Sequence, residues 1–287
     1  MTQHRFRYAL ETAAAYATYG FFRVLPIDTA SNIGGWIGRK VGMLLAGPTR
    51  TARQNLAMAL PEKSAQEREK IILGMWDNLG RVFAEYAHLH RIWERVELHG
   101  AEMLPAIRDG GKPAIFCSAH LANWEINAVA PKQYGIDVHV VYRKPNNPGV
   151  DGLLRHARDV GAASHIQKGN AGAKEMLSVL KKNGVLGLLI DQKLNEGIPV
   201  PFFGRDAMTA PAIAYFANKF NCGVHPCRIE RLKGCHFRMT VFPAVPVPHS
   251  GNKDNDAMEM MTDINRQIEG WVRERPEQWL WIHHRWG

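Results

Sequence analysis

The 287-residue chain lacks the features that identify several common classes of protein. It has few cysteines, which are Cys117, Cys222, Cys227 and Cys235. Their spacing matches no disulfide framework. His225 and His236 lie near three of them, but no Cys-x2-Cys pair typical of a zinc site is present. We therefore expect buried thiols in a reducing compartment and no metal centre.

The chain also has no long uninterrupted apolar run. A helix that spans a membrane needs roughly 18–20 consecutive apolar residues, and charged residues interrupt every apolar stretch before that length. A cleavable signal peptide, an internal repeat, a low-complexity tract and a zinc-finger or RNP motif are not visible either. These absences argue against a spanning anchor and against a nucleic-acid partner.

Acidic residues are outnumbered by basic ones. Lys plus Arg count 36 and Asp plus Glu count 27, which gives a formal net charge of +9. A basic balance suits nucleic acid, an anionic membrane surface or an acidic ligand. Because nucleic-acid motifs are not visible, we favour an anionic membrane surface or an acidic ligand as the partner.

Two apolar stretches near the N-terminus carry basic residues at their edges. Residues 8–26 are rich in Ala, Tyr, Phe and Leu, and residues 33–46 form a second apolar patch. The basic residues around them are Arg5, Arg7, Arg23, Arg39 and Lys40. Such segments are typical of amphipathic helices that lie in a membrane interface. An ordinary helical extension packed on the rest of the domain explains the pattern equally well.

A long helix is expected after residue 64. Ser64 and Glu67 form a capping box, which is a signature of a helix start. The apolar residues that follow at helical spacing are Ile71, Met75, Leu79, Val82 and Tyr86. Because this spacing places them on one face, we assign the stripe to the core and to no functional site.

From Pro113 onward, strand-like and helical patterns alternate. Strands are expected over 113–117, 136–142, 185–190, 223–229 and 237–243. Helices are expected near 123–133, 149–160, 171–183, 209–220 and 258–272. This alternation predicts an α/β fold with a mixed, mostly parallel sheet, covered by helices on both faces and preceded by a helical extension. We divide the chain into a membrane-associating helical region, 1–95, and an α/β domain, 96–287.

The stretch 113–125 holds the first candidates for chemistry. An apolar run, 114–117, is typical of a buried strand, and His120 and Glu125 follow it with four residues between them. On a straight helix this separation places two side chains about 140° apart. A working pair therefore needs His120 in the turn after the strand and Glu125 in the next helix. The carboxylate would then hold one imidazole nitrogen and leave the other free as a base.

Taken alone, a His followed by a Glu is more often a surface pair or a contact at a helix start. The position of His120 at the carboxyl end of a strand favours function, because open α/β sheets bind ligands there. Asp191 and Gln192 close the predicted strand 185–190, so they lie at the carboxyl end of a strand as well.

Arginines after the second predicted strand are candidates for substrate binding. Arg143 follows that strand, and Arg155 and Arg158 lie on the helix after it. Guanidinium groups bind phosphate and carboxylate with two hydrogen bonds. A solvated basic face is the common alternative explanation.

A segment rich in Pro and Phe offers apolar candidates. Phe202 and Phe203 are either core residues or the wall of an apolar channel, and Gly204 follows them directly. Thr209 is expected to cap the next helix, with Pro211 in its first turn.

Together these segments resemble the late acyltransferases of lipid A biosynthesis, of lauroyl or myristoyl type, which are related to glycerol-phosphate acyltransferases. The resemblance covers nearly the whole chain, and its specificity comes from the order and number of short motifs. The motifs are the N-terminal apolar helix, Arg53-Gln54-Asn55-Leu56, Pro61-Glu62-Lys63-Ser64, Asn78-Leu79-Gly80 before Glu85, His120 to Glu125 with Asn123 and Trp124 between them, Tyr142-Arg143, Arg158 before Gly161, Asp191-Gln192, Pro201-Phe202-Phe203-Gly204 and the tail from Pro276 to Trp286.

The resemblance implies an enzyme of lipopolysaccharide biosynthesis, without a cofactor, at the cytoplasmic face of the inner membrane. It implies transfer of a fatty acyl chain from acyl carrier protein to a hydroxyl of a phosphorylated glycolipid, a lipid A precursor. By this resemblance His120 is the base, Glu125 orients it, Arg158 is essential and Asn123 contributes to substrate binding. Related enzymes acylate phosphatidylinositol mannosides or ornithine lipids from acyl-CoA, so another membrane lipid is an alternative acceptor.

Acyl transfer also fits the residue types, because an imidazole can take the proton of an alcohol as it attacks a thioester carbonyl. A hydrolase that uses His120 and Glu125 on water or a metal is an alternative. It lacks a plausible set of metal ligands and a Gly-x-Ser-x-Gly motif. A non-catalytic membrane-surface protein is a third possibility, and it leaves the coincidence of His120, Glu125 and Arg158 unexplained.

Overall fold

The computed structural model describes residues 2–286. The chain begins with the helices α1 (Thr2–Val24), α2 (Ile27–Gly42), α3 (Ala46–Ala59) and α4 (Ala65–Glu85). Short helical turns then lead into the sheet: η1 (Tyr86–His88), α5 (Leu89–Ile92) and η2 (Trp93–Arg95). The remaining elements are β1 (Val96–His99), α6 (Met103–Asp109), β2 (Ala114–Ser118), α7 (Ile126–Gln133), β3 (Val138–Tyr142), α8 (Pro148–Arg158), β4 (Ala162–Gln167), α9 (Asn170–Lys181), β5 (Val185–Leu189), β6 (Ile198–Phe202), β7 (Arg205–Thr209), α10 (Ala212–Phe220), β8 (Gly223–Lys233), β9 (His236–Val241), α11 (Lys253–Glu274) and η3 (Pro276–Gln278).

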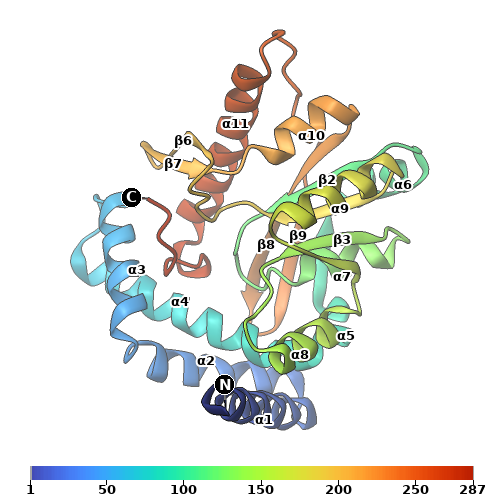
Figure 1. Cartoon of the computed structure of the whole chain (residues 1–287). Coiled ribbons are helices and arrows are strands. Elements are labelled where there is room, and N and C mark those ends of the chain that lie inside the picture. The colour runs from blue at the N-terminus through green and yellow to red at the C-terminus, as the bar shows by residue number, and fades with distance from the viewer. Residues whose placement is uncertain (1, 287) are drawn as a thin grey trace.

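Within the described residues, seven strands form one sheet in the order β1-β9-β8-β2-β5-β3-β4, and β6 and β7 form a separate hairpin (Figure 1). Neighbouring strands of the seven-stranded sheet are parallel except β8 and β9, which are antiparallel. The predicted α/β fold with a mixed, mostly parallel sheet is therefore confirmed. Parallel strands end at the same edge of a sheet, and here Ser118 at the end of β2 pairs with Leu189 at the end of β5.

Helices cover both faces of this sheet. On β2, Ile115 and Cys117 belong to one buried cluster, whereas Ala114 and Phe116 belong to another. Helices α3, α10 and α11 contribute to the first cluster, and α5 and α7 contribute to the second. Burial of every β2 residue explains why this strand is a continuous apolar run rather than an alternating one. The four cysteines are free and buried, as expected.

The N-terminal helices share the core of the sheet domain. Leu56 on α3 and Ile72 on α4 lie in the same buried cluster as Ile115 and Trp281. The predicted stripe of α4 is buried, and Ser64 and Glu67 form the predicted capping box. The division of the chain at residue 95 stays a prediction.

The predicted strands are observed as β2, β3, β5, β8 and β9, and the predicted helices as α7 to α11. The prediction that Thr209 caps a helix was wrong. Thr209 ends strand β7, where it pairs with Ile198, and Pro211 occupies the position before α10. The physical reason is that pairing with β6 extends the backbone as far as Thr209 before the helix begins.

Helices α2 and α4 pack closely where they cross, because glycines line their contact. A Cβ added to Gly80 on α4 would lie 2.1 Å from the carbonyl oxygen of Gly34 and 2.8 Å from the Cα of Gly38. Real Cβ atoms do not come so close to backbone atoms, so larger residues would force the helices apart. Residues 27–42 are therefore packed on the domain, in agreement with the alternative of a packed helical extension.

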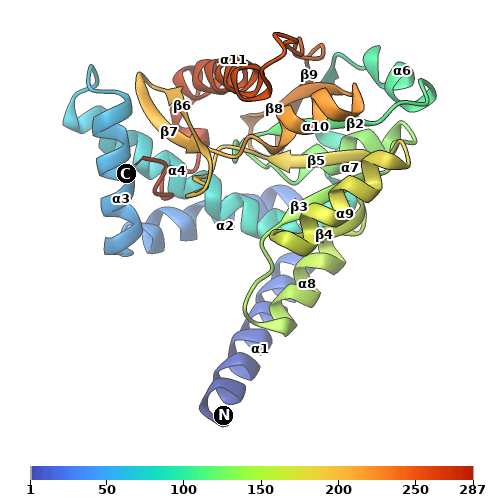
Figure 2. The same ribbon diagram turned by 45° about the horizontal axis from the view of Figure 1, so that its top comes forward.

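The outer side of the N-terminal helices remains apolar and exposed. Trp36, Ile37 and Val41 on α2 are exposed, and so is Leu44, which follows the helix. On α1 the exposed apolar residues are Phe6, Leu10, Tyr16, Phe21 and Val24. Figure 2 shows α1 extending away from the sheet with α8 beside it. Among residues 2–286, none of the helices combines the length and apolar character that crossing a membrane requires.

Candidate functional site

The loops after β2 and β5 bring His120 and Asp191 together. Each residue lies two positions beyond the end of its strand, and those strands are neighbours. The Nδ1 atom of His120 is 2.8 Å from Oδ1 of Asp191, and the backbone N–H of His120 donates to Oδ2 at 2.9 Å. His120 therefore lies in the turn after the strand, as predicted, and a carboxylate holds one nitrogen of its ring.

Asp191 is ionised in this setting. Its side chain is 1% exposed, and burial alone would raise its pKa. The charge and hydrogen bonds of His120, with a hydrogen bond from the Trp279 indole at 2.7 Å, outweigh burial and hold the pKa of Asp191 well below its usual range. An ionised carboxylate only accepts hydrogen bonds. The Nδ1 atom of His120 therefore donates, and when the ring carries a single hydrogen, Nε2 is its acceptor atom.

The other side of the His120 ring faces aromatic and polar groups. The Trp124 ring contacts it edge-on at a centroid distance of 5.2 Å, and the His283 ring lies at 5.5 Å. The amide Nε2 of Gln192 is 3.2 Å from Nε2 of His120. The His120 side chain remains 15% exposed, so the nitrogen opposite Asp191 is the one oriented to act on a ligand.

Glu125 does not occupy the position that the sequence predicted for it. Both of its oxygens accept hydrogen bonds from Arg158, at 2.7 Å each, and Oε1 also accepts from the Tyr86 hydroxyl and from the Trp124 indole. The physical reason is the path of the chain after His120. Ala122 has a left-handed backbone with φ of 48°, and Glu125 stands at the position before α7 rather than inside it.

Glu125 and Arg158 form a charged pair with little exposure to solvent, since their side chains are 8% and 18% exposed. Burial raises the pKa of Glu125, but Arg158 outweighs burial and lowers it. Burial and the charge of Glu125 raise the pKa of Tyr86 well above its ordinary value. Tyr86 thus donates its phenol hydrogen to Glu125. The sequence analysis assigned Tyr86 to the core only, and the structure adds this hydrogen bond.

Arg158 joins the neighbourhood of His120 through Trp124 and Glu125, and its guanidinium lies 6.0 Å from the centre of the Tyr142 ring. Arg143 and Arg155 are exposed. Arg143 follows β3, which ends at the same edge of the sheet as β2 and β5, and the charge of Arg155 acts on Tyr142. All three arginines therefore lie near this edge, and their contact with a substrate stays a prediction.

Four residues that the sequence analysis named as substrate-binding contact other parts of the protein or form a turn. Asn123 is fully buried, and its side chain donates to Glu85 and accepts from the backbone of Glu125. Phe202 and Phe203 are buried against three tryptophans, Trp279, Trp281 and Trp286, which places them in the core rather than along a channel. Gly204, with φ of 70°, completes the tight turn between β6 and β7. Internal packing and a turn account for these residues.

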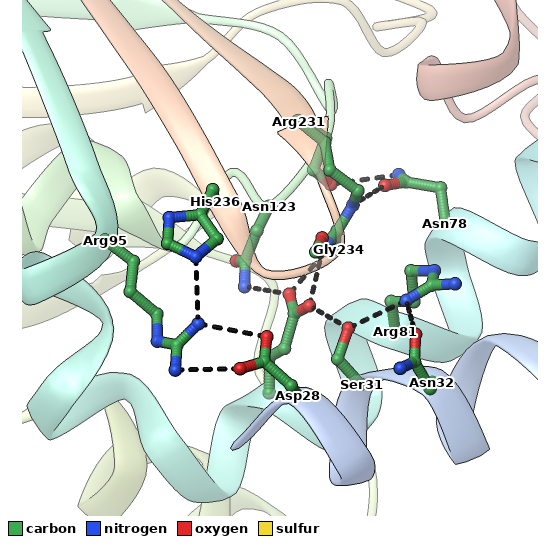
Figure 3. A network of polar contacts seen from close by, with 12 residues as sticks. Asp28, Ser31, Asn32, Asn78, Arg81, Arg95, Asn123, Arg231, Gly234 and His236 are labelled. Carbon is green, nitrogen blue, oxygen red and sulfur yellow. Dashed lines mark hydrogen bonds and ion pairs between the residues drawn. The ribbon is translucent and has the colours of Figure 1, made fainter.

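A buried polar network holds the loop that carries His120 (Figure 3). Asn78 donates to the carbonyl of Ala122 at 3.0 Å, and Asn123 donates to Glu85 at 2.9 Å. Arg231 from β8 binds both oxygens of Glu85, at 2.5 and 3.0 Å, and donates to Asn78 at 2.9 Å. Burial opposes the charge of Glu85, but Arg231 outweighs burial and lowers its pKa. The loop is thus fixed by α4 and by the β8–β9 hairpin.

The C-terminal tail supports the same loop from the other side. Leu121 forms an isolated antiparallel bridge with Trp279, and the backbone N–H of Leu280 donates to the carbonyl of His120 at 3.2 Å. Figure 1 shows the tail returning past α4 to end beside α3. Sequence reasoning named this tail only as part of a resemblance. Its Trp279 and His283 are residues of the site that periodicity could not reveal.

The fold and the site define a class of protein, α/β proteins that carry a hydrogen-bonded imidazole–carboxylate pair at the carboxyl edge of a mostly parallel sheet. Residues 3–287 match the family model of the bacterial lipid A biosynthesis acyltransferases. The chain belongs to that family.

Individual relatives agree with this assignment. A lipid A biosynthesis acyltransferase of Haemophilus influenzae is 27% identical over 263 residues, which cover 87% of this chain and 78% of that protein. The lipid A biosynthesis myristoyltransferase of Escherichia coli is 26% identical over 255 residues, covering 86% and 77%. The lauroyltransferase of the same organism is 23% identical over 273 residues, covering 91% and 86%. These relatives span most of the chain, including both strands that carry the His120–Asp191 pair.

Proposed function

We propose that this acyltransferase moves a fatty acyl chain from an acyl thioester to a hydroxyl of a lipid A precursor, with His120 as the general base and Asp191 as the group that orients it. The observation that carries the proposal is the His120–Asp191 pair at the edge of the sheet, in which the carboxylate holds Nδ1 and Nε2 is the nitrogen that can face a substrate hydroxyl. Membership of the lipid A acyltransferase family supports the choice of reaction and acceptor.

The residues account for each proton in the reaction. His120 Nε2 takes the proton of the acceptor hydroxyl as its oxygen forms a bond to the thioester carbonyl carbon. Asp191 stabilises the imidazolium that results, because its carboxylate is ionised and hydrogen-bonded to Nδ1. When the carbon–sulfur bond breaks, the imidazolium returns the proton to the thiolate of the leaving carrier. The products are an ester and a free thiol, and the base is regenerated.

The Glu125–Arg158 pair has a different part in the proposal. Two nitrogens of Arg158 donate to Glu125 and Tyr86, so the guanidinium is held rigidly at the rim of the site. A rigid cation beside the base is suited to position an anionic acceptor. Arg143 and Arg155, which are exposed, are assigned the more flexible contacts with phosphate groups of the glycolipid.

The donor and the location complete the proposal. The chain's net charge of +9 favours an acidic carrier, so we infer acyl carrier protein as the donor, with acyl-CoA as the alternative. The exposed apolar side chains of α1 and α2, with basic residues among them, suit the surface of an anionic bilayer. We place the enzyme at the cytoplasmic face of the inner membrane, where its lipid acceptor is within reach.

The proposal is tested by turnover of the purified protein with acyl carrier protein or CoA thioesters and a lipid A precursor. We expect His120→Ala to lower kcat by ~10²–10⁴-fold, the usual value of general base catalysis. His249→Ala, in an exposed loop before α11, serves as the matched control. Wild-type turnover in His120→Ala would refute the mechanism. Lipid mass spectrometry of a deletion strain identifies the acceptor, because lipid A should lack one secondary acyl chain; a change confined to phospholipid or ornithine lipid would reassign it.

A further inference from the structure

The amide nitrogen of Gln192 lies between two imidazoles. Its Nε2 is 2.9 Å from Nε2 of His283 and 3.2 Å from Nε2 of His120. Gln192 follows Asp191 directly on the loop after β5, whereas His283 comes from the C-terminal tail. The two histidine rings themselves lie 5.5 Å apart between centroids. Gln192 is thus the polar bridge between them.

The protonation states on both sides define the direction of these hydrogen bonds. Because the ionised Asp191 accepts from Nδ1 of His120, Nε2 of the neutral ring can only accept. An amide nitrogen carries two hydrogens and accepts none, so Gln192 donates to His120 and, with its second hydrogen, to His283. Burial and the neighbouring His120 lower the pKa of His283 to about 4, so its ring is neutral near pH 7 and can accept.

His283 is held in place by its backbone. Asn55 on α3 donates to the carbonyls of Trp281 and His283, at 2.7 and 2.6 Å. Two residues further on, the buried Arg285 donates to the carbonyl of Met208 at 3.0 Å. The tail is therefore anchored before and after the imidazole, and its Nε2 presents a fixed acceptor to Gln192.

We propose that His283 is a positioning residue, which holds the Gln192 amide so that one N–H is directed at the oxyanion formed when the thioester is attacked. The inference rests on the proposed function. In the free enzyme that N–H points to Nε2 of His120. In the proposed reaction, the attacking hydroxyl donates to the same nitrogen and so displaces the Gln192 N–H. We expect the displaced N–H to donate to the thioester oxygen, while the second N–H stays on His283.

Neighbouring groups are less suited to this task. His283 is a poor second base, because burial and the neighbouring His120 lower its pKa to about 4. Arg158 directs Nε and Nη2 to Glu125 and Tyr86. A donor that is already oriented needs no rearrangement as negative charge develops, and removal of one such donor costs ~10²–10³-fold in kcat.

The first test compares kcat and KM of His283→Phe and His283→Gln with the wild type. Phe keeps a ring but has no acceptor, so we expect kcat to fall by about 10–10²-fold with little change in KM, somewhat less than the loss of the donor itself. Gln places a carbonyl oxygen near the former Nε2 and should recover part of the rate. His284→Phe, at the exposed neighbouring position, is the matched control and should keep wild-type turnover.

The second test is a double-mutant cycle with Gln192→Leu. If His283 acts through Gln192, His283→Phe should cause no further loss of kcat in the Gln192→Leu background. A structural defect would persist in that background, so multiplied losses would overturn the proposal, as would wild-type turnover in His283→Phe. His120→Ala in the same assay separates the two hypotheses. Turnover in His120→Ala would refute the proposed function, whereas loss there with full activity in His283→Phe would refute only the role of His283.

Discussion

Asp191 holds His120 at two points, the imidazole Nδ1 and the backbone N–H. One contact fixes the tautomer and orientation of the ring, and the other ties the loop after β2 to the loop after β5. The carboxylate is in turn held by the Trp279 indole. The His120 ring is therefore positioned by three segments that are distant in sequence, and each can be tested by substitution.

The tautomer of His120 should depend on the charge of Asp191. In Asp191→Asn the side-chain amide can donate to Nδ1, which would place the ring hydrogen on Nε2 and remove the free lone pair. We expect kcat to fall by ~10³–10⁴-fold, as in triads where the same change was made, while the double variant with His120→Ala is no worse than His120→Ala alone. Asp206→Asn, on the exposed β6–β7 hairpin, is the control. Unchanged turnover in Asp191→Asn would show that its carboxylate does not set the base.

The buried Glu85–Arg231 pair should contribute to stability. Their side chains are 0% and 8% exposed, so Arg231→Met leaves an uncompensated buried carboxylate and should cost about 3–5 kcal/mol in the free energy of unfolding. Adding Glu85→Gln removes that charge and should restore part of the loss. Urea denaturation measures both variants. Arg266→Met, on the exposed face of α11, provides a control that should leave stability nearly unchanged.

The crossing of α2 and α4 should tolerate no side chain at Gly80. A Cβ there would lie 2.1 Å from a backbone oxygen of Gly34, so Gly80→Val must separate the helices and should lower the melting temperature by several degrees. Gly20→Ala on α1 is the control, because nothing lies within 4 Å of its added Cβ and alanine favours a helix. A melting temperature for Gly80→Val equal to that of the wild type would mean that the crossing is not a tight contact.

The outer side of α2 should carry a large part of the binding to membranes. Replacing Trp36, Val41 and Leu44 with Gln removes exposed apolar area and should weaken binding to anionic vesicles at every salt concentration. Replacing Arg39 and Lys40 with Gln should weaken binding at low salt only, because salt screens the charges. Arg266→Gln, an exposed arginine on α11, is the control for charge. Vesicle sedimentation measures the binding of each variant. Wild-type binding by the variant without the apolar residues would show that another surface contacts the membrane.

Stability should fall in mildly acidic solution, in part through His283. Burial and His120 lower its folded pKa to about 4, whereas an unfolded imidazole titrates near 6.5. Between these values the unfolded chain binds the proton more readily, so the free energy of unfolding falls as pH decreases through this window. His283→Phe should reduce the decrease, as measured by urea midpoints from pH 7 to pH 4. His120, Asp191 and His284 are the titratable groups that act on the His283 ring, and they must stay unchanged in the comparison.

The elements with strong periodicity could be predicted from the sequence. Strands β2 and β5 are short apolar runs, and α4 has a capping box and a regular stripe. Strand β4 was missed because its sequence, AASHIQ, has only one fully buried apolar residue between polar ones. The β6–β7 hairpin was missed because it turns at Phe203 and Gly204, and phenylalanine rarely adopts a left-handed backbone.

Three residues of the candidate site could be named from the sequence, whereas their partners could not. His120, Asp191 and Gln192 follow the ends of strands, which is a signal available in the sequence. That β2 and β5 are neighbours depends on the sheet order, which no spacing along the chain determines. Glu125 was paired with His120 because it is near in sequence, but the left-handed turn at Ala122 carries it to Arg158 instead.

The Asn147 side chain connects helices α1 and α8 through hydrogen bonds. Its side-chain oxygen accepts from the backbone of Gly149 as the cap of α8 and from the Thr12 hydroxyl on α1, at 3.0 Å each. Its amide donates to the carbonyl of Tyr8, also on α1, at 2.9 Å. Helix α1 therefore completes the polar contacts at the start of α8, the helix that ends with Arg158.

A variant that lacks α1 would therefore not measure membrane binding alone. Deleting α1 frees the amide of Asn147 and also removes the partner of His88, whose ring nitrogen contacts the carbonyl of Phe22 at 2.8 Å. Loss of activity in such a deletion would combine detachment from lipid with a loosened support for Arg158. Only substitutions on the exposed side of α1, such as Phe6 and Leu10, separate the two effects.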